Sequence, residues 1–224
     1  MNLQEKIAKS RKVIKEAAER YPKEKLAVAW TGGKDSTVML HLIHEVFDGK
    51  VPFPVVFNDS IMEFPEVYEF IDKLTQKWNL NLVRVLHLKR ELAKFHRTRD
   101  PEKKKELSRL MKISAIRWAT KKYKFAAYMV AIRWDEHKSR SKEKYFSPRE
   151  DHMRVHPLLH FSEKDIWDYI KTKKVPYASL YDKGYRSLGE APFTKPAKKG
   201  KGERSGREHD KELVMQRLRD LGYW

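Results

Sequence analysis

The sequence predicts an α/β fold in which helices cover both faces of a mostly parallel sheet of five strands. One observation is an apolar run at residues 26–30 that ends in two glycines and is followed by apolar residues at helical spacing. Another is that strand-like and helix-like segments continue to alternate along the chain, which is typical of right-handed βαβ units. A length of 224 residues suits one domain with appendages. We therefore expect a three-layer αβα architecture with a Rossmann-like sheet.

Each element is predicted from its own stretch of sequence. Residues 2–20 carry an apolar stripe at helical spacing, and Pro22 ends that helix. The helix after the glycines runs through Val38 and Ile43, and another helix begins at Pro65. Apolar runs predict further strands at 51–57, 79–86 and 125–132, with a short edge segment at 153–159. A basic helix is expected within 97–124 and one more after Ser162.

The chain divides near residue 175. Residues 1–175 are expected to form the nucleotide-binding α/β domain with its N-terminal helix, and residues 176–224 an extension that covers the site. Glycine and proline make the beginning of this extension irregular, and a helix is expected again at 208–220. A loop of this length is usually either functional or disordered. The extension is cationic through Lys195, Lys198, Lys199, Lys201, Arg204 and Arg207.

Composition narrows the possible functions. The sequence has 49 Lys and Arg against 31 Asp and Glu, a net charge of +18, so a polyanion, nucleotide or oxyanion is a suitable partner. It has no cysteine, which excludes thiolate metal sites, iron–sulfur clusters and cysteine nucleophiles. No run of 18 apolar residues and no signal-peptide pattern is present, so we expect a cytoplasmic protein without membrane contact. Abundant Lys and Glu with sparse Asn and Gln suit a thermophile.

The glycine turn predicts a phosphate site. Glycines allow close backbone approach, and a helix N-terminus with a lysine favours an anion. The order of residues does not match G-x-x-x-x-G-K-[ST], because no glycine stands five residues before Gly33. A turn without any ligand is the alternative. The residues of this turn are Trp30, Thr31, Gly32, Gly33, Lys34, Asp35 and Ser36.

Polar residues also follow the second and fourth strands, and the carboxyl ends of parallel strands share one edge of the sheet. At this edge, Asn58 and Asp59 are candidates for contact with a nucleotide or Mg²⁺. Asp59 could equally be a residue that stabilises a turn. Arg133, Lys138 and Arg140 could surround an oxyanion, since guanidinium groups bind sulfate and phosphate with two hydrogen bonds. A charged loop without a ligand is the alternative.

Residues 97–124 form the most basic block, with eleven Lys or Arg against three Asp or Glu. A solvated helix face is favoured over a nucleic-acid surface, so RNA stays a possible but not a preferred partner.

Several blocks resemble one family. Residues 31–36, Thr-Gly-Gly-Lys-Asp-Ser, resemble the pyrophosphate loop of ATP pyrophosphatases. Residues 52–70 resemble the second-strand motif of the phosphoadenosine phosphosulfate reductase family. Residues 132–143, 203–207 and 221–224 resemble blocks of the sulfate adenylyltransferase small subunit, and residues 176–189 also resemble a segment of FAD synthetases. The resemblance implies an adenine nucleotide α-hydrolase-like fold that uses ATP with Mg²⁺.

The resemblance further implies an adenylyltransferase in which sulfate attacks the α-phosphate and pyrophosphate leaves. The small subunit that this chain resembles normally works with a GTPase partner. FAD synthesis, tRNA modification and a nucleotide-binding regulator are the alternatives. Reductases of the family use a cysteine, so thiol-dependent reduction is not expected here. The expected catalytic residues are Lys34, Arg133 and Arg140, and the expected Mg²⁺ ligands are Asp35 and Asp59. The residues expected to contact ATP are Trp30, Thr31, Gly32, Gly33, Lys34, Asp35, Ser36 and Asn58. The residues expected to contact the substrate anion are Arg133, Lys138, Arg140, Arg204 and Arg207.

Overall fold

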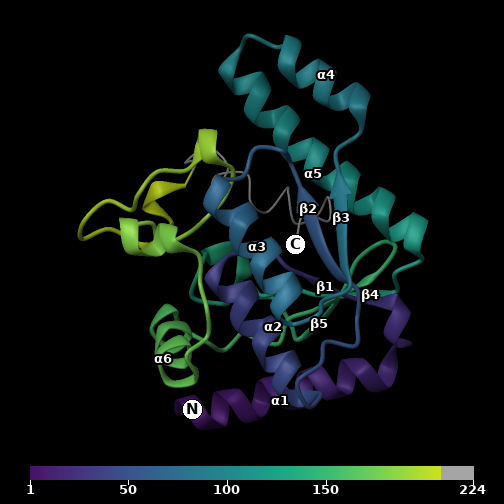
Figure 1. Cartoon of the computed structure of the whole chain (residues 1–224), viewed down its shortest axis with the longest axis vertical. Helices are drawn as coiled ribbons and strands as arrows, with labels where there is room; N and C mark the ends of the chain where they lie inside the picture. Colours follow the sequence, from purple (N-terminus) through teal and green to yellow (C-terminus); the bar gives the residue numbers. More distant parts are fainter. Residues whose placement is uncertain (208–224) are drawn as a thin grey trace.

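The computed structural model describes residues 1–207 and shows a twisted sheet with helices on both faces (Figure 1). The strand order is β3-β2-β1-β4-β6-β5, and every neighbouring pair is parallel except β5 with β6. The strands are β1 (Leu26–Ala29), β2 (Val55–Asp59), β3 (Leu82–Leu86), β4 (Ala127–Met129), β5 (Phe146–Pro148) and β6 (Met153–Val155). The predicted three-layer α/β fold is confirmed.

Two apolar clusters lie on opposite faces of the sheet. Val28, Val55 and Phe57 pack on one face with side chains from α1, α2, α3 and α6, while Ala27 and Val56 pack on the other with α5. This alternation of neighbouring residues between the faces is the period of two that an extended strand imposes. The helices are α1 (Leu3–Arg20), α2 (Lys34–Val46), α3 (Pro65–Lys77), α4 (Lys89–Arg97), α5 (Pro101–Tyr123) and α6 (Glu163–Lys173).

Helix boundaries follow local chemistry. Asn2 and Glu5 form a capping box at the start of α1, and Ser162 and Asp165 form another at the start of α6. Helix α3 begins with Pro65 in its first turn, as predicted. Beyond α6 the described chain contains only short 3-10 turns, η3 (Ser179–Lys183), η4 (Ala191–Phe193) and η5 (Glu203–Gly206), so its irregular character is also confirmed.

Two predicted details were wrong. The sheet has six strands instead of five, because residues 146–148 add an antiparallel edge strand; this strand is short, contains Pro148 and carries no apolar run. The predicted strands at 125–132 and 153–159 shorten to three residues each, because β4 and β6 pair only over Ala127–Met129 and Met153–Val155. The basic helix expected within residues 97–124 is confirmed as α5, which begins after its cap residue Asp100.

The predicted helix at 208–220 lies outside the described residues. Within residues 1–207, the apolar stretches of the helices are too short to cross a bilayer.

The tight turn before α2 depends on Gly32. Its φ is +71°, and an added Cβ would lie 3.0 Å from Val67 Cγ1 and 3.3 Å from Ile71 Cγ1. We expect Gly32→Ala to lower the free energy of unfolding by about 1–3 kcal/mol, since a side chain is strained in this region of φ. Gly33→Ala is the control, because Gly33 has a φ of −73°. Urea titration of both variants measures the difference, and equal stabilities would contradict the expectation.

Candidate active site

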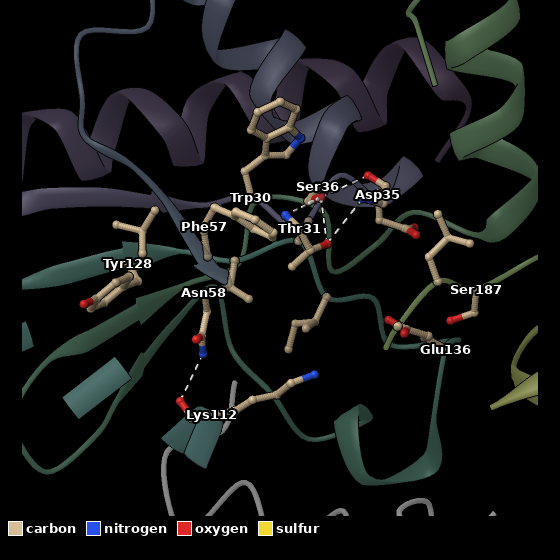
Figure 2. A pocket seen from close by; sticks show the side chains of 18 of the residues that line it. Trp30, Thr31, Asp35, Ser36, Phe57, Asn58, Lys112, Tyr128, Glu136 and Ser187 are labelled. Carbon is tan, nitrogen blue, oxygen red and sulfur yellow. Dashed lines mark hydrogen bonds between the residues drawn. The ribbon is translucent and has the colours of Figure 1, made fainter. Parts of the chain in front are cut away.

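The site lies where the sheet reverses its winding order. Strand β1 is flanked by β2 on one side and β4 on the other, and ligands of open parallel sheets bind beyond the carboxyl ends of strands at such a point. A cavity of about 260 Å³ opens there (Figure 2). One part of its wall is apolar, with Val56, Phe57, Ile116 and Val130. This part suits a purine ring, and the cavity then leads toward the glycine turn.

Hydrogen bonds fix the glycine turn at the mouth of the cavity. The Thr31 and Ser36 hydroxyls lie 3.2 Å apart, and Ser36 Oγ donates to the Gly33 carbonyl at 3.0 Å (Figure 2). The backbone N–H of Lys34 donates to the Tyr181 hydroxyl at 2.8 Å. Tyr181 belongs to η3, so the C-terminal extension completes the start of α2.

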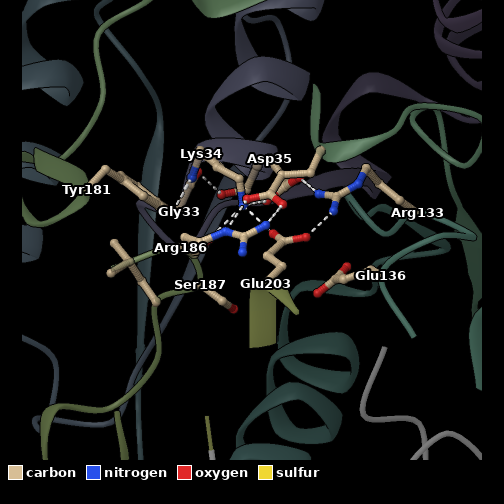
Figure 3. Close-up of polar contacts among 12 residues, drawn as sticks. Gly33, Lys34, Asp35, Arg133, Glu136, Tyr181, Arg186, Ser187 and Glu203 are labelled. Atoms are coloured by element: carbon tan, nitrogen blue, oxygen red, sulfur yellow. Dashed lines mark hydrogen bonds and ion pairs between the residues drawn. The ribbon is translucent and has the colours of Figure 1, made fainter. Parts of the chain in front are cut away.

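A ring of four charged side chains, Lys34, Asp35, Arg133 and Glu203, joins the glycine turn to the C-terminal extension (Figure 3). We call it the charge ring. The Lys34 ammonium contacts Asp35 Oδ2 at 3.1 Å and also Glu203 Oε1. The Arg133 guanidinium contacts Asp35 Oδ1, Glu203 Oε2 and, at 2.9 Å, Asp135. Both cationic side chains are fully buried. Burial alone would lower the pKa of Arg133, but Glu203, Glu136 and Asp135 raise it above its usual value.

A second group of charges lines the cavity nearby. Arg140 and Arg204 both bind the Glu136 carboxylate, the latter at 2.6 Å. Burial opposes ionisation of Glu136, but Arg140 and Arg204 lower its pKa to about 2. Arg207 also lines the cavity and donates to Ser187 Oγ at 3.2 Å. Two groups of paired charges therefore lie at the site: the charge ring at the glycine turn, whose cations Lys34 and Arg133 do not line the cavity, and the group around Glu136, which does.

The structure brings together most of the residues that the sequence singled out. The predicted anion contacts Arg140, Arg204 and Arg207 line the cavity, whereas Arg133 lies in the charge ring. Lys138 is exposed and does not line the cavity. Asn58 lines the cavity and donates to the Lys112 carbonyl at 3.0 Å.

The two predicted Mg²⁺ ligands do not converge. Asp59 Oδ1 accepts from Ile61 N at 2.8 Å and from the Tyr68 hydroxyl at 2.7 Å, so this carboxylate stabilises the turn after β2. Asp35 lies beside the glycine turn, where a cation bound to phosphates would pass. Within residues 1–207, no group of three His, Asp or Glu has the arrangement of a metal site. Of the two carboxylates, only Asp35 lies where it could join the phosphate oxygens of a nucleotide in holding Mg²⁺. Nucleotide sites usually hold this ion mainly through phosphate oxygens.

A buried polar group flanks the cavity at the ends of β2 and β3. Glu190 accepts from Ser108 Oγ at 2.6 Å and pairs with Lys112 at 3.1 Å. Burial raises the pKa of Glu63, which lines the cavity. His87 is buried here, and neither of its ring nitrogens has a hydrogen-bond partner. Burial, assisted by Lys112, lowers the pKa of His87 to about 4.

The buried His87 makes stability depend on pH. Between pH 6.5 and 4 the unfolded chain binds a proton at this residue and the folded chain does not, so stability falls as the pH falls through this window. We expect His87→Phe to remove about 1–3 kcal/mol of the acid-induced loss between pH 7.5 and 4.5. Urea titrations at both pH values measure it, and an unchanged pH dependence in the variant would contradict this assignment.

Comparison with known proteins identifies the family of the chain. The family model for the phosphoadenosine phosphosulfate reductase domain matches residues 25–196. The chain belongs to the phosphoadenosine phosphosulfate reductase family. This membership confirms the family predicted from the pyrophosphate loop and the second-strand motif.

Two relatives of the chain are named sulfate adenylyltransferase subunit 2. The chain is 34% identical to sulfate adenylyltransferase subunit 2 of Parabacteroides distasonis, over 80% of this chain and 67% of that protein. It is 30% identical to a subunit 2 of Marinobacter nauticus, over 86% of this chain and 71% of that protein. The fold resembles phosphoadenylyl-sulfate reductase from Candida auris, with a TM-score of 0.69, 23% identity, and coverage of 83% and 90% of the two chains. It also resembles Candida glabrata FMN adenylyltransferase, with a TM-score of 0.67, 20% identity, and coverage of 98% and 82%.

Three residues of the site were not predicted. Glu203 and Tyr181 come from the C-terminal extension, far in sequence from the glycine turn that they contact. Glu136 lies between two arginines that were assigned to an anion. The available signals were the family-like blocks at residues 176–189 and 203–207 and the position of Glu136 within the arginine-rich segment. Neither signal indicates which cation a carboxylate will contact.

Proposed function

We propose that this protein is the ATP-binding sulfate adenylyltransferase of its family, which transfers AMP from ATP to sulfate and releases pyrophosphate. The observation that carries the proposal is the charge ring, in which a lysine of the glycine turn and the arginine after β4 bind one carboxylate beside a nucleoside-sized cavity. A phosphate group presents oxygens to cations in the same manner. Relatives at 30–34% identity named sulfate adenylyltransferase subunit 2 support sulfate as the acceptor.

ATP would lie with its adenosine in the apolar part of the cavity and its phosphates along the turn. The backbone of Gly32 and Gly33, the Lys34 ammonium and the Ser36 hydroxyl would hold the departing pyrophosphate. Arg133 would contact the same phosphates, because it shares the Glu203 carboxylate with Lys34. Mg²⁺, held by these phosphates and Asp35, would neutralise part of their charge.

Sulfate would bind on the side of the cavity that carries Arg140, Arg204 and Arg207. One sulfate oxygen forms a bond to the α-phosphorus while the bond between that phosphorus and the bridging oxygen breaks, and pyrophosphate takes the electron pair. Sulfate is already ionised at neutral pH, so no general base is needed. The side chains act by placement and by stabilising charge in the transition state.

We infer that the C-terminal extension covers the site with its described part, residues 176–207, since Tyr181 and Glu203 reach the glycine turn; residues 208–224 lie outside the described residues. We also propose that the protein acts in the cytoplasm, works with a GTPase subunit and comes from a thermophile. The surplus of Lys and Arg is compatible with RNA as an alternative partner, but no described feature favours it.

The deciding experiment measures adenylyl transfer with several acceptors. The purified protein, alone and with a GTPase subunit of a relative, is given ATP and Mg²⁺ with sulfate, FMN or tRNA. We expect pyrophosphate release only with sulfate. Formation of ATP from adenylyl sulfate and pyrophosphate checks the same chemistry in reverse. Release with FMN alone would instead assign FAD synthesis, release with tRNA alone would assign tRNA modification, and tight ATP binding without any transfer would indicate a regulator.

The absence of cysteine gives a separate prediction. Reduction of an adenylyl sulfate by a thiolate requires a sulfur nucleophile, which no residue of this sequence supplies. We expect no sulfite when the protein is incubated with phosphoadenosine phosphosulfate and reduced thioredoxin. Stoichiometric sulfite, measured by a colorimetric thiol-exchange assay, would contradict this expectation despite the family name.

A further inference from the structure

The Glu203 carboxylate occupies the position that the proposed function gives to a phosphate. Its side chain is 10% exposed, and its two oxygens contact Lys34 and Arg133 separately (Figure 3). A carboxylate is a planar anion with two neighbouring oxygens, and one edge of a phosphate or sulfate tetrahedron presents the same pair to cations. Glu203 thus acts here as an anion supplied by the chain itself.

Lys34 has no capacity left for a further anion while Glu203 is bound. An ammonium group has three N–H donors. Those of Lys34 face Asp35 Oδ2 at 3.1 Å, the Arg186 carbonyl at 2.8 Å and Glu203 Oε1. An incoming phosphate must therefore replace one of these partners. Glu203 is the partner furthest along the chain from the glycine turn and belongs to a short 3-10 segment, η5, so it can leave without unfolding the turn.

The ion pairs of Glu203 and Arg204 and hydrogen bonds from backbone N–H groups hold η5 over the site. Lys195 N donates to the Gly206 carbonyl at 2.9 Å, and Lys198 N donates to Ser205 Oγ at 3.0 Å. Gly206 packs so closely that an added Cβ would lie 2.0 Å from the Lys195 carbonyl oxygen. The fit depends on the absence of a side chain at this position, which gives a way to dislodge the segment without changing its charge.

We propose that Glu203 is a specificity-determining residue that competes with every anion for Lys34 and Arg133 and so keeps a lone oxyanion out of the phosphate site. A tethered group competes at an effective concentration in the millimolar range. Glu203 lowers the fraction of molecules in which the phosphate site is free. The apparent affinity for each anion falls by the same factor. ATP tolerates this reduction because its adenosine makes further contacts, whereas sulfate has only the two cations to bind.

This selection follows from the proposed function, in which sulfate is also a substrate. Sulfate bound at Lys34 would block ATP, so the enzyme must bind sulfate beside Arg140 and Arg204 and reject it at the glycine turn. In the proposal, Glu203 makes ATP the ligand that opens the phosphate site.

The test measures binding of two probes, pyrophosphate and sulfate, by calorimetry in the full chain. Glu203→Gln keeps the shape and removes the charge, while Gly206→Ala displaces η5 and keeps the charge. Glu45→Gln is the matched control, because Glu45 also binds one arginine and one lysine, Arg11 and Lys173, each at 2.9 Å. In both site variants we expect the affinity for pyrophosphate to rise by about tenfold or more. We expect a rise of the same size in the affinity for sulfate, measured by its competition with pyrophosphate. Glu45→Gln should change neither.

Hydrogen exchange provides a second readout. Pyrophosphate should speed exchange of the Lys195 and Lys198 amides in the wild type, and in the two variants these amides should exchange fast without ligand. Unchanged or weakened pyrophosphate binding in Glu203→Gln would overturn the proposal, since a carboxylate that supports bound phosphate lowers affinity when removed. The probes involve no acceptor, so this result is separate from the acceptor assay: transfer to FMN would refute the proposed function and leave the Glu203 competition intact.

Discussion

Replacing Arg133 with alanine is expected to lower turnover by about a hundredfold, the usual effect of removing one preorganised donor from a charged transition state. Arg133 is fully buried and joins the glycine turn to the C-terminal extension through Asp35 and Glu203. Arg133→Lys should fail as well, because an ammonium cannot reproduce the planar guanidinium that contacts three carboxylates. Pyrophosphate release at saturating ATP and sulfate measures the effect.

Two further variants make the Arg133 result specific. Arg149→Ala is the control for loss of a buried arginine, because Arg149 is 7% exposed and pairs with Glu143 away from the cavity. It should retain turnover. Arg140→Ala is expected to cost about a hundredfold too, because Arg140 lines the cavity on the proposed sulfate side. If both Arg133→Ala and Arg140→Ala release pyrophosphate at the wild-type rate, the anion site must instead be formed by Arg204 and Arg207.

Replacing Lys34 with alanine is expected to weaken ATP binding by about 1.5–3 kcal/mol, the range for a hydrogen bond to a charged group. That loss corresponds to roughly a tenfold to 150-fold rise in the dissociation constant. Lys34 has no exposed side-chain surface and its ammonium faces Glu203, so the variant also leaves that carboxylate with Arg133 alone. Calorimetry with a non-hydrolysable ATP analogue measures the loss.

The Lys34 result can be separated from a general effect of charge. Lys6→Ala removes another lysine that pairs with a carboxylate, Asp165 at 2.5 Å, and neither residue lines the cavity. It should leave ATP affinity unchanged. If Lys34→Ala binds the analogue as tightly as the wild type does, the glycine turn does not hold the phosphates.

The sequence predicts the core of the sheet and the glycine turn because both depend on local order. Residues 26–37 contain a strand, a turn and a helix start within reach of one another, and the structure forms them as β1 and α2. Edge strands are harder to predict. Strand β5 consists of Phe146, Ser147 and Pro148, which carry no periodic pattern, and its pairing with β6 arises from tertiary contact.

The site could be predicted only where its residues follow strand ends. Arg140 and Asn58 were singled out in this way, because parallel strands bring their carboxyl ends together, and both line the cavity. The partners of the charges could not be found, since ion pairing depends on how a loop folds back. Arg133 was expected to face an incoming anion together with Lys138 and Arg140, whereas Glu203, 70 residues away, reaches it and also Lys34. Long-range carboxylates of this kind leave no local pattern.

The edge strands also limit how the protein can associate. Strand β5 is three residues long and contains Pro148, which has no backbone N–H to offer to another strand. At the opposite edge, β3 carries Arg84, whose guanidinium pairs with Asp72 of α3. Short strands, proline and charge at an edge oppose pairing with a second sheet. A partner subunit must therefore dock through side chains of helices and loops, and the sheet should resist the strand addition by which unprotected β edges start aggregation.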